Sequence, residues 1–186
     1  MEISDTKQVA NYWESLRAAL LNPNSIYPRP SVEALLAKID QADFRNFTDA
    51  DGHLTGSALI LDATSRFVLL IHHPKLKKWI QPGGHIDPGE SPHQTAARES
   101  LEETGLADLI LQSEAPLDID VHEIPAGKTE AHRHYDLRFE FRYAIKVTQE
   151  SEWTSELPCR WIRLENVASI CQEESVLRMI KMIQNR

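Results

Sequence analysis

The stretch GHIDPGESPHQTAARESLEETGL, residues Gly84–Leu106, decides how this chain of 186 residues is interpreted. Its first residues read as the end of a loop, and its later residues carry the signals of a helix. Ser91 is a favoured N-cap residue, Pro92 suits the first helical position, and Gln94 completes a capping box. The sequence therefore predicts a helix that spans about residues 92 to 104.

Three glutamates, Glu99, Glu102 and Glu103, lie at positions i, i+3 and i+4 of this helix, which should end at a left-handed cap on Gly105. At 3.6 residues per turn they share an arc of about 100°. The opposite side would carry Ala97, Leu101 and Thr104. We therefore expect one buried face and one acidic face.

Close carboxylates repel one another, and no lysine or arginine follows any of the three glutamates at i+4. A solvated surface face is the commoner explanation for such a triplet taken alone. A bound cation would also offset the repulsion, and hard oxygen ligands suit Mg²⁺ or Mn²⁺. Such an ion polarises phosphoryl oxygens and activates a bound water.

The longer spacing decides between these explanations. Gly84 is followed after five residues by Glu90, after seven more by Arg98-Glu99, after two by Glu102-Glu103, and after one by Gly105-Leu106. This pattern resembles the signature of the Nudix hydrolases. One departure is Ser100, where the family pattern usually has an aliphatic residue and where serine can face the core with a small loss of packing.

The resemblance implies an α/β fold, an α/β/α sandwich on a mixed β-sheet. Strand patterns agree with it: apolar runs at 58–61 and 67–71, alternating patterns at 117–121 and 137–147, and a short run at 160–164. Residues 81–85 read as a loop, and an amphipathic helix closes the chain. We assign residues 51–186 to this domain.

We expect residues 1–50 to form an N-terminal helical extension that packs on or adjoins the domain. Apolar residues recur at helical spacing over residues 6 to 21, and Ser31 can cap a second helix with Val32, Leu35, Leu36 and Ile39 on one face. The extension leaves open a regulatory function or a homodimer.

By resemblance, Glu99 and Glu103 would bind the metal, Mg²⁺ or its substitute Mn²⁺, and Glu102 would ligate it or activate water. Gly83 would lend its carbonyl oxygen, and Gly84 would let the loop fold tightly. Arg98 would turn back toward Glu90 and orient the acids. The implied reaction is attack of water on phosphorus in a diphosphate linkage of a nucleoside diphosphate derivative.

Further residues are candidates for an alternative base or for substrate contacts. Glu140 and Asp136 lie on the polar parity of a strand, and Glu130 and Glu156 are weaker candidates; any one of these acids can instead simply face solvent. His132 and His134 share the parity of Asp136, and His85 follows the double glycine. These histidines could bind phosphate, donate a proton, hold Zn²⁺, or form only a hydrogen-bonded rim.

Composition limits the class of partner. A net charge of −8 disfavours nucleic acid, and 41% hydrophobic residues without a long apolar run disfavour a membrane span. The first residues do not resemble a secretory signal, which favours a cytoplasmic location. The expected partner is a small phosphorylated molecule, such as a sugar nucleotide, a dinucleotide cofactor, a dinucleoside polyphosphate or a damaged nucleoside triphosphate.

Two rival functions share the implied fold. A non-catalytic nucleotide-binding or sensor module would have lost acids of the signature, and none is lost. An isoprenoid-diphosphate isomerase would need a suitably placed cysteine, and we expect neither Cys159 nor Cys171 to stand near the signature or on an identifiable pocket strand. The hydrolase remains the favoured interpretation.

Overall fold

The structure, a computed structural model, describes residues 2–41, 52–126 and 130–186, with side chains from residue 7 onward in the first helix. The helices are α1 (Glu2–Leu20), α2 (Arg29–Ile39), α3 (Pro92–Thr104), the 3-10 helix η1 (Leu164–Ser169) and α4 (Glu174–Gln184). The strands are β1 (His53–Leu61), β2 (Phe67–His73), β3 (Lys78–Ile80), β4 (Gly83–His85), β5 (Leu109–Leu111), β6 (Asp118–Ile124), β7 (His132–Tyr143), β8 (Ser151–Thr154) and β9 (Pro158–Arg163).

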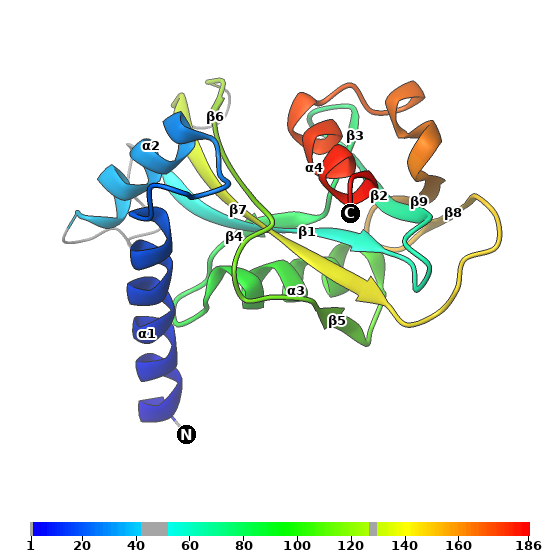
Figure 1. Ribbon diagram of the computed structural model, residues 1–186. Coiled ribbons are helices and arrows are strands. Elements are labelled where there is room, and N and C mark those ends of the chain that lie inside the picture. The colour runs from blue at the N-terminus through cyan, green and yellow to red at the C-terminus, as the bar shows by residue number, and fades with distance from the viewer. Residues whose placement is uncertain (1, 42–51, 127–129) are drawn as a thin grey trace.

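These strands form one mixed sheet in the order β5-β7-β1-β2-β9-β8, with β3 paired to β2, β4 to β1 and β6 to β7. The pairing of β1 with β7 is parallel, and the other strand pairs among the described residues are antiparallel. Helices α3 and α4 lie on opposite sides of this sheet (Figure 1). The predicted α/β/α sandwich on a mixed sheet is confirmed.

Each face of the sheet has its own apolar core. On one face, Ala58 and Ile60 of β1 pack with Ala96 of α3 and with apolar residues of α1 and α2. On the other face, Leu59 and Leu61 pack with the buried side of α4. Because successive side chains of a strand point to opposite faces, β1 is buried almost throughout its length and reads as a nearly continuous apolar run.

The N-terminal extension packs on the domain. Val9, Tyr12 and Leu16 of α1 and Val32 and Leu35 of α2 belong to the same buried cluster as the sheet. The proposed boundary at 50/51 lies outside the described residues, which stop at 41 and resume at 52. No helix in the described ranges is long and apolar enough to cross a membrane.

Helix α3 begins and ends at the predicted residues. The Gln94 side chain accepts a hydrogen bond of 2.8 Å from the Ser91 amide, and Gly105 forms the left-handed cap with φ of 70°. One part of the prediction is wrong, since Leu101 is 50% exposed. The buried side instead runs through small residues such as Ala96 and Ser100, which let the helix approach the sheet closely.

Ser100 shows how that close approach is stabilised. Its side chain is fully buried, and its hydroxyl donates to the Ala96 carbonyl oxygen at 2.6 Å. A Cβ at Gly56 of β1 would overlap the backbone of Pro92, at the start of the same helix. The helix and the strand therefore meet with little space between them, and a serine satisfied by its own helix fits where a larger aliphatic side chain is usual.

Three other expectations are corrected. The second helix begins at Arg29 with Pro28 at the N-cap, so Ser31 lies inside its first turn. The segment expected as a loop at 81–85 contains β4, which pairs with β1. The strand expected over 137–147 runs over residues 132–143, because its early polar residues pair with β1 and β6.

Candidate active site

The acidic side of α3 faces the glycines of β4. The Gly83 amide donates a hydrogen bond of 3.0 Å to the Glu103 carboxylate. A Cβ added at Gly84 would overlap the Glu99 carboxylate, so a larger residue there would displace that side chain from its observed position. The strand and the helix therefore bring two of the predicted acids, Glu99 and Glu103, against the glycines that precede them in the signature.

Arg98 connects the other acids. Its guanidinium donates to Glu90 at 2.9 and 3.1 Å, to Glu99 at 2.8 Å and to Glu102 at 3.3 Å, and also to the His85 carbonyl oxygen at 3.1 Å. The expected turn of Arg98 toward Glu90 is present. These contacts raise the pKa of the guanidinium further, with the hydrogen bond to Glu90 as the largest cause.

The charges of the three helix acids are therefore not offset equally. Glu99 and Glu102 pair with Arg98, whereas no residue in the described part of the chain forms an ion pair with Glu103. Burial raises the pKa of Glu103 to about 7, and the hydrogen bond from Gly83 only partly opposes this effect. Burial also raises the pKa of Glu99 despite the contact with Arg98. Of the three helix acids, Glu103 is therefore the one whose negative charge has no cationic side chain paired with it among the described residues.

This imbalance predicts a pH dependence of the metal-free protein. The pKa of Glu103 in the fold, about 7, lies above its reference value of 4.5. Protonated Glu103 therefore favours the folded state, fully below pH 4.5 and less as the pH rises through 7. In EDTA, we expect Glu103→Gln to raise Tm relative to wild type by roughly 4–8 °C at pH 8 and by little at pH 4.5, after allowance for solvent screening. Calorimetry of both proteins at the two pH values measures the difference, and equal differences would contradict the assignment.

The two leading alternative bases lie elsewhere. Glu140 is buried on the α4 side of the sheet and pairs with Arg142 and Arg186. Asp136 accepts hydrogen bonds from Thr55, Ser57 and Arg138 at 3.0, 2.9 and 2.7 Å. Donors thus already surround both carboxylates, and these donors come from residues other than those of α3.

Asp136 belongs to a buried charge network centred on Arg138, which is 2% exposed. Arg138 pairs with Asp136 at 2.7 Å, with Asp120 at 3.2 Å and with Asp118 at 3.4 Å. Arg178 of α4 pairs with Asp118 and Asp120 from the other side, at 2.6 and 2.9 Å. The network therefore links β6 and β7 to α4.

Of the two weaker candidates, Glu130 and Glu156, only Glu156 influences an acid of α3. Its charge contributes to the raised pKa of Glu103, and the adjacent Leu157 amide donates to the Glu103 carbonyl oxygen at 3.2 Å. Glu130 has a different environment, since its carbonyl oxygen contacts His132 at 2.8 Å. Of the four candidate acids outside the signature, Glu156 is the one whose charge contributes to the raised pKa of Glu103.

The predicted histidines do come together. His85 Nε2 lies 3.2 Å from His134 Nε2, and the rings of His132 and His134 are 5.3 Å apart. His53 and His122 join them, with ring centroids 5.5 and 5.6 Å from that of His134. Burial, and then the neighbouring histidines, lower the pKa of His134 to about 3. The alternating pattern of its strand gave a weak sequence signal for His122. No pattern in the neighbouring sequence indicated that His53 belongs to the cluster.

Cys159 corrects one expectation. It is buried, and its Sγ lies 3.7 Å from the Glu103 carbonyl oxygen, so this cysteine is close to the signature in space although distant in sequence. Burial raises the pKa of its thiol to about 11. Cys171 is also buried. A neutral, enclosed thiol gives little support to the isomerase alternative.

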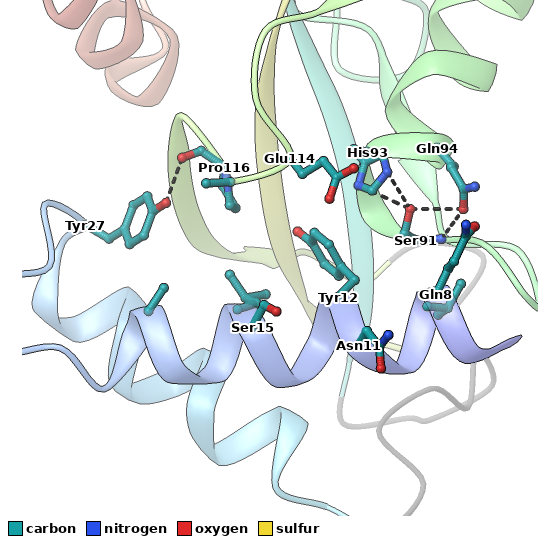
Figure 2. Close-up of a pocket in the computed structure, with 14 residues that line it drawn as sticks. Gln8, Asn11, Tyr12, Ser15, Tyr27, Ser91, His93, Gln94, Glu114 and Pro116 are labelled. Carbon is teal, nitrogen blue, oxygen red and sulfur yellow. Dashed lines mark hydrogen bonds between the residues drawn. The ribbon is translucent and has the colours of Figure 1, made fainter. Parts of the chain in front are cut away.

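A cavity of about 510 Å³ lies at a different place, between α1 and the start of α3. Its wall includes Tyr12, Ser91, His93 and Glu114, as Figure 2 shows, while the Tyr27 hydroxyl donates to the Pro116 carbonyl oxygen at 2.8 Å. None of the three helix glutamates lines it. The cavity therefore belongs to the junction between the extension and the domain.

Fold and site together define an α/β domain in which a glycine-bearing strand meets an acidic helix. The family model described as NUDIX domain matches residues 53–183. The chain belongs to the Nudix family and is a Nudix-type hydrolase.

Named relatives agree with this membership. A "Probable DHNTP pyrophosphohydrolase" of Lactococcus lactis subsp. cremoris (strain MG1363) is 32% identical over 126 residues, covering 66% of this chain and 71% of the relative. An asymmetrical bis(5'-nucleosyl)-tetraphosphatase of Rattus norvegicus is 27% identical over 117 residues, covering 62% of this chain and 76% of the relative.

Solved structures show the same fold. The dihydroneopterin triphosphate pyrophosphohydrolase of E. coli superposes with a TM-score of 0.54 at 18% identity, over 72% of this chain and 96% of that one. A NUDIX family hydrolase of Clostridium perfringens gives a TM-score of 0.52 at 24% identity, over 72% of this chain and 97% of that one.

Proposed function

We propose that this chain hydrolyses a diphosphate linkage in a nucleoside diphosphate derivative with Mg²⁺, which Mn²⁺ can replace. The observation that carries the proposal is the grouping of Glu99, Glu102 and Glu103 on one side of α3, with Glu103 left without an ion pair among the described residues. A divalent cation supplies the missing charge. It would also screen a phosphorylated substrate from a protein whose net charge is −8.

The position of two of the acids supports the ligands that we propose. Glu99 and Glu103 lie against β4, where the Gly83 carbonyl oxygen is the proposed third ligand. Carboxylate and carbonyl oxygens are the donors that Mg²⁺ prefers, and Mg²⁺ keeps waters and phosphate oxygens in its remaining positions. When bound, the ion would neutralise charge on the phosphoryl group under attack.

The other acids receive distinct roles. Glu102, whose side chain is 50% exposed, is the proposed base that takes a proton from the attacking water. Arg98 is a positioning residue, because it holds Glu90, Glu99 and Glu102 with one guanidinium. One phosphorus–oxygen bond forms to water and the bridging one breaks, so that two phosphorylated products leave.

The substrate class rests on the relatives. Two of them are named for a DHNTP and for a bis(5'-nucleosyl) tetraphosphate, compounds that contain chains of linked phosphates. Both names support a nucleotide-like substrate with a phosphoanhydride bond. Within the class, sugar nucleotides, dinucleotide cofactors, dinucleoside polyphosphates and oxidised nucleoside triphosphates are the compounds to compare.

A panel of these substrates with Mg²⁺, with Mn²⁺ and with EDTA tests the proposal. We expect phosphorylated products from at least one substrate with either metal and background rates in EDTA, because the acids alone would repel the substrate. Product analysis by chromatography and ³¹P NMR identifies the bond that breaks. Turnover that ignores EDTA would contradict the metal requirement. Binding without turnover across the panel would favour the sensor alternative.

A further inference from the structure

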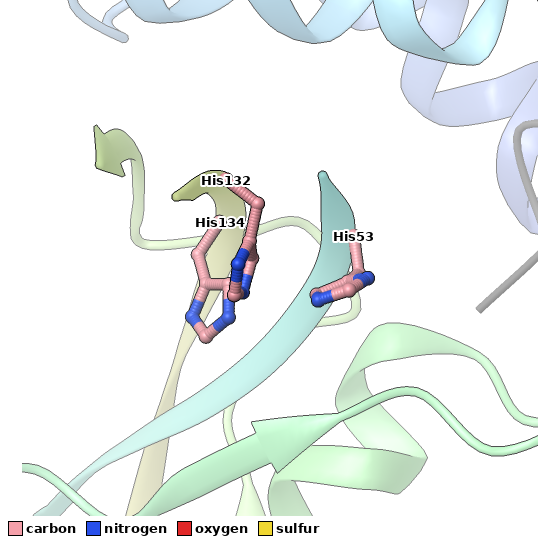
Figure 3. Close-up of side chains that lie close together, drawn as sticks. All are labelled: His53, His132 and His134. Carbon is pink, nitrogen blue, oxygen red and sulfur yellow. The ribbon is translucent and has the colours of Figure 1, made fainter. Parts of the chain in front are cut away.

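A second cluster of potential metal ligands lies at one end of the sheet. The ring nitrogens of His53, His132 and His134 offer one ligand atom each, and these atoms all lie within 4.8 Å of one another. Figure 3 shows the three side chains close together, His53 from β1 and the other two from β7. All three are partly accessible. The cluster therefore combines convergence with a route for an ion to enter.

The register of the strands explains this convergence. His53 is the parallel partner of His134 in the pairing of β1 with β7, and His132 lies two residues earlier on the same side of β7. His85 of β4 is paired with Thr55, two residues after His53. Three strands thus bring their histidines to one face at one end, which is a consequence of backbone pairing and not of chance side-chain contact.

We propose that His53, His132 and His134 bind one transition-metal ion of the Zn²⁺ type, with His85 as a fourth nitrogen ligand. Zinc–nitrogen bonds of about 2.0–2.1 Å place two nitrogens of one tetrahedral ion about 3.3 Å apart. The observed separation of His85 Nε2 from His134 Nε2 is 3.2 Å. The ligand nitrogens of His53, His132 and His134 lie within 4.8 Å of one another, so a bound ion would draw them closer together.

The hydrogen bonds of His132 also favour metal binding. Its Nδ1 lies 2.8 Å from the Glu130 carbonyl oxygen. Since a carbonyl oxygen only accepts, Nδ1 carries the proton, and Nε2 keeps a lone pair for an ion. A histidine ligand held through its second nitrogen by a backbone carbonyl is a common arrangement around zinc.

A metal suits the cluster better than the phosphate of a substrate does. Phosphate would require several protonated imidazoles, which would repel one another at ring separations of 4.6 to 5.5 Å. The neighbouring Arg138 and Arg178 are already paired with aspartates. Imidazole nitrogens also select Zn²⁺, Ni²⁺ or Cu²⁺ and leave Mg²⁺ to the carboxylates of α3. The two sites should therefore hold different ions.

Titration of the metal-depleted full chain in excess Mg²⁺ tests the proposal, with Zn²⁺ followed by calorimetry and Co²⁺ by visible absorption. We expect one equivalent to bind and Co²⁺ to give the intense bands of a tetrahedral nitrogen site. His53→Ala and His132→Ala should each weaken binding at least about 100-fold, since even second-shell changes cost 10–100-fold. Glu103→Gln should bind as wild type does, which keeps the outcome distinct from that of the proposed hydrolysis.

His72→Ala is the matched control, because His72 lies on β2 and contacts Trp79 outside the cluster. Equal loss in this variant, loss in Glu103→Gln, or undetectable Zn²⁺ binding by wild type would overturn the proposal. If inorganic phosphate bound to the cluster in the same titration and Zn²⁺ did not, the proposal would also be overturned, and the cluster would be an anion site. Imidazole ¹⁵N resonances of wild type, which should shift at the metal-bound nitrogens, provide a measurement that needs no variant to fold.

Discussion

Replacing Glu103 by glutamine is expected to lower the rate of Mg²⁺-dependent hydrolysis about 10³-fold, because the loss of one metal ligand removes roughly 4 kcal/mol of charge stabilisation. The substitution keeps the shape of the side chain and an oxygen that can accept from the Gly83 amide. Folding should therefore survive. The measurement is kcat/KM with the best substrate of the panel, over a range of Mg²⁺ concentrations.

Two other glutamates make this experiment specific. Glu174→Gln is the matched control, since Glu174 is an exposed residue of another helix and its change should leave the rate as it is. Glu102→Gln should lower kcat while the Mg²⁺ concentration at half-saturation stays nearly constant, as expected of a base. If Glu103→Gln kept the wild-type rate at ordinary Mg²⁺, the proposed ligand set would be wrong.

Replacing Arg138 by methionine is expected to destabilise the fold by about 3–5 kcal/mol, which lowers Tm by roughly 10 °C for a chain of this size. The cost arises because three buried or half-buried aspartates lose a partner, and Asp136 loses the only ion pair that it forms among the described residues. Asp118 and Asp120 keep Arg178. Thermal and denaturant unfolding measure the change.

A second substitution locates the effect. The double variant Arg138→Met, Asp136→Asn also removes the charge that the first change leaves unpaired. Its loss of unfolding free energy should therefore be smaller than the sum of the losses in the two single variants. Arg160→Met is the matched control, because Arg160 pairs with Glu150 and Glu152 near the surface, where an ion pair contributes about 0–1 kcal/mol. Equal destabilisation by Arg138→Met and Arg160→Met would contradict the importance of the buried network.

Local signals in the sequence predicted α3 best. The capping box at Ser91 and the left-handed Gly105 are chemical properties of a few neighbouring residues, and the helix begins and ends accordingly. The resemblance to the signature likewise anticipated the grouping of Glu99 with Glu103. Both predictions needed no knowledge of how distant strands pair.

Other features depend on pairing and could not be predicted. The strands β3, β4 and β5 have three residues each, too few for a periodic pattern, and exist because a neighbouring strand offers hydrogen bonds. The register that sets His53 beside His134 is equally invisible in the sequence. Leu101 was expected inside because it is apolar, but the close contact of α3 with the sheet selects small residues instead.

The shared core of the extension and the domain has an evolutionary consequence. Tyr12 and Leu35 are packed in one cluster with Ile119 and Tyr135 of the sheet, and Tyr12 also contacts the His93 ring at the start of α3. A change of side-chain volume on one side of this contact alters the fit on the other. Among relatives that possess the extension, these positions should change in compensating pairs, and independent drift in an alignment would contradict that expectation. The helices before the family-matched residues would then be inherited with the sheet as one unit.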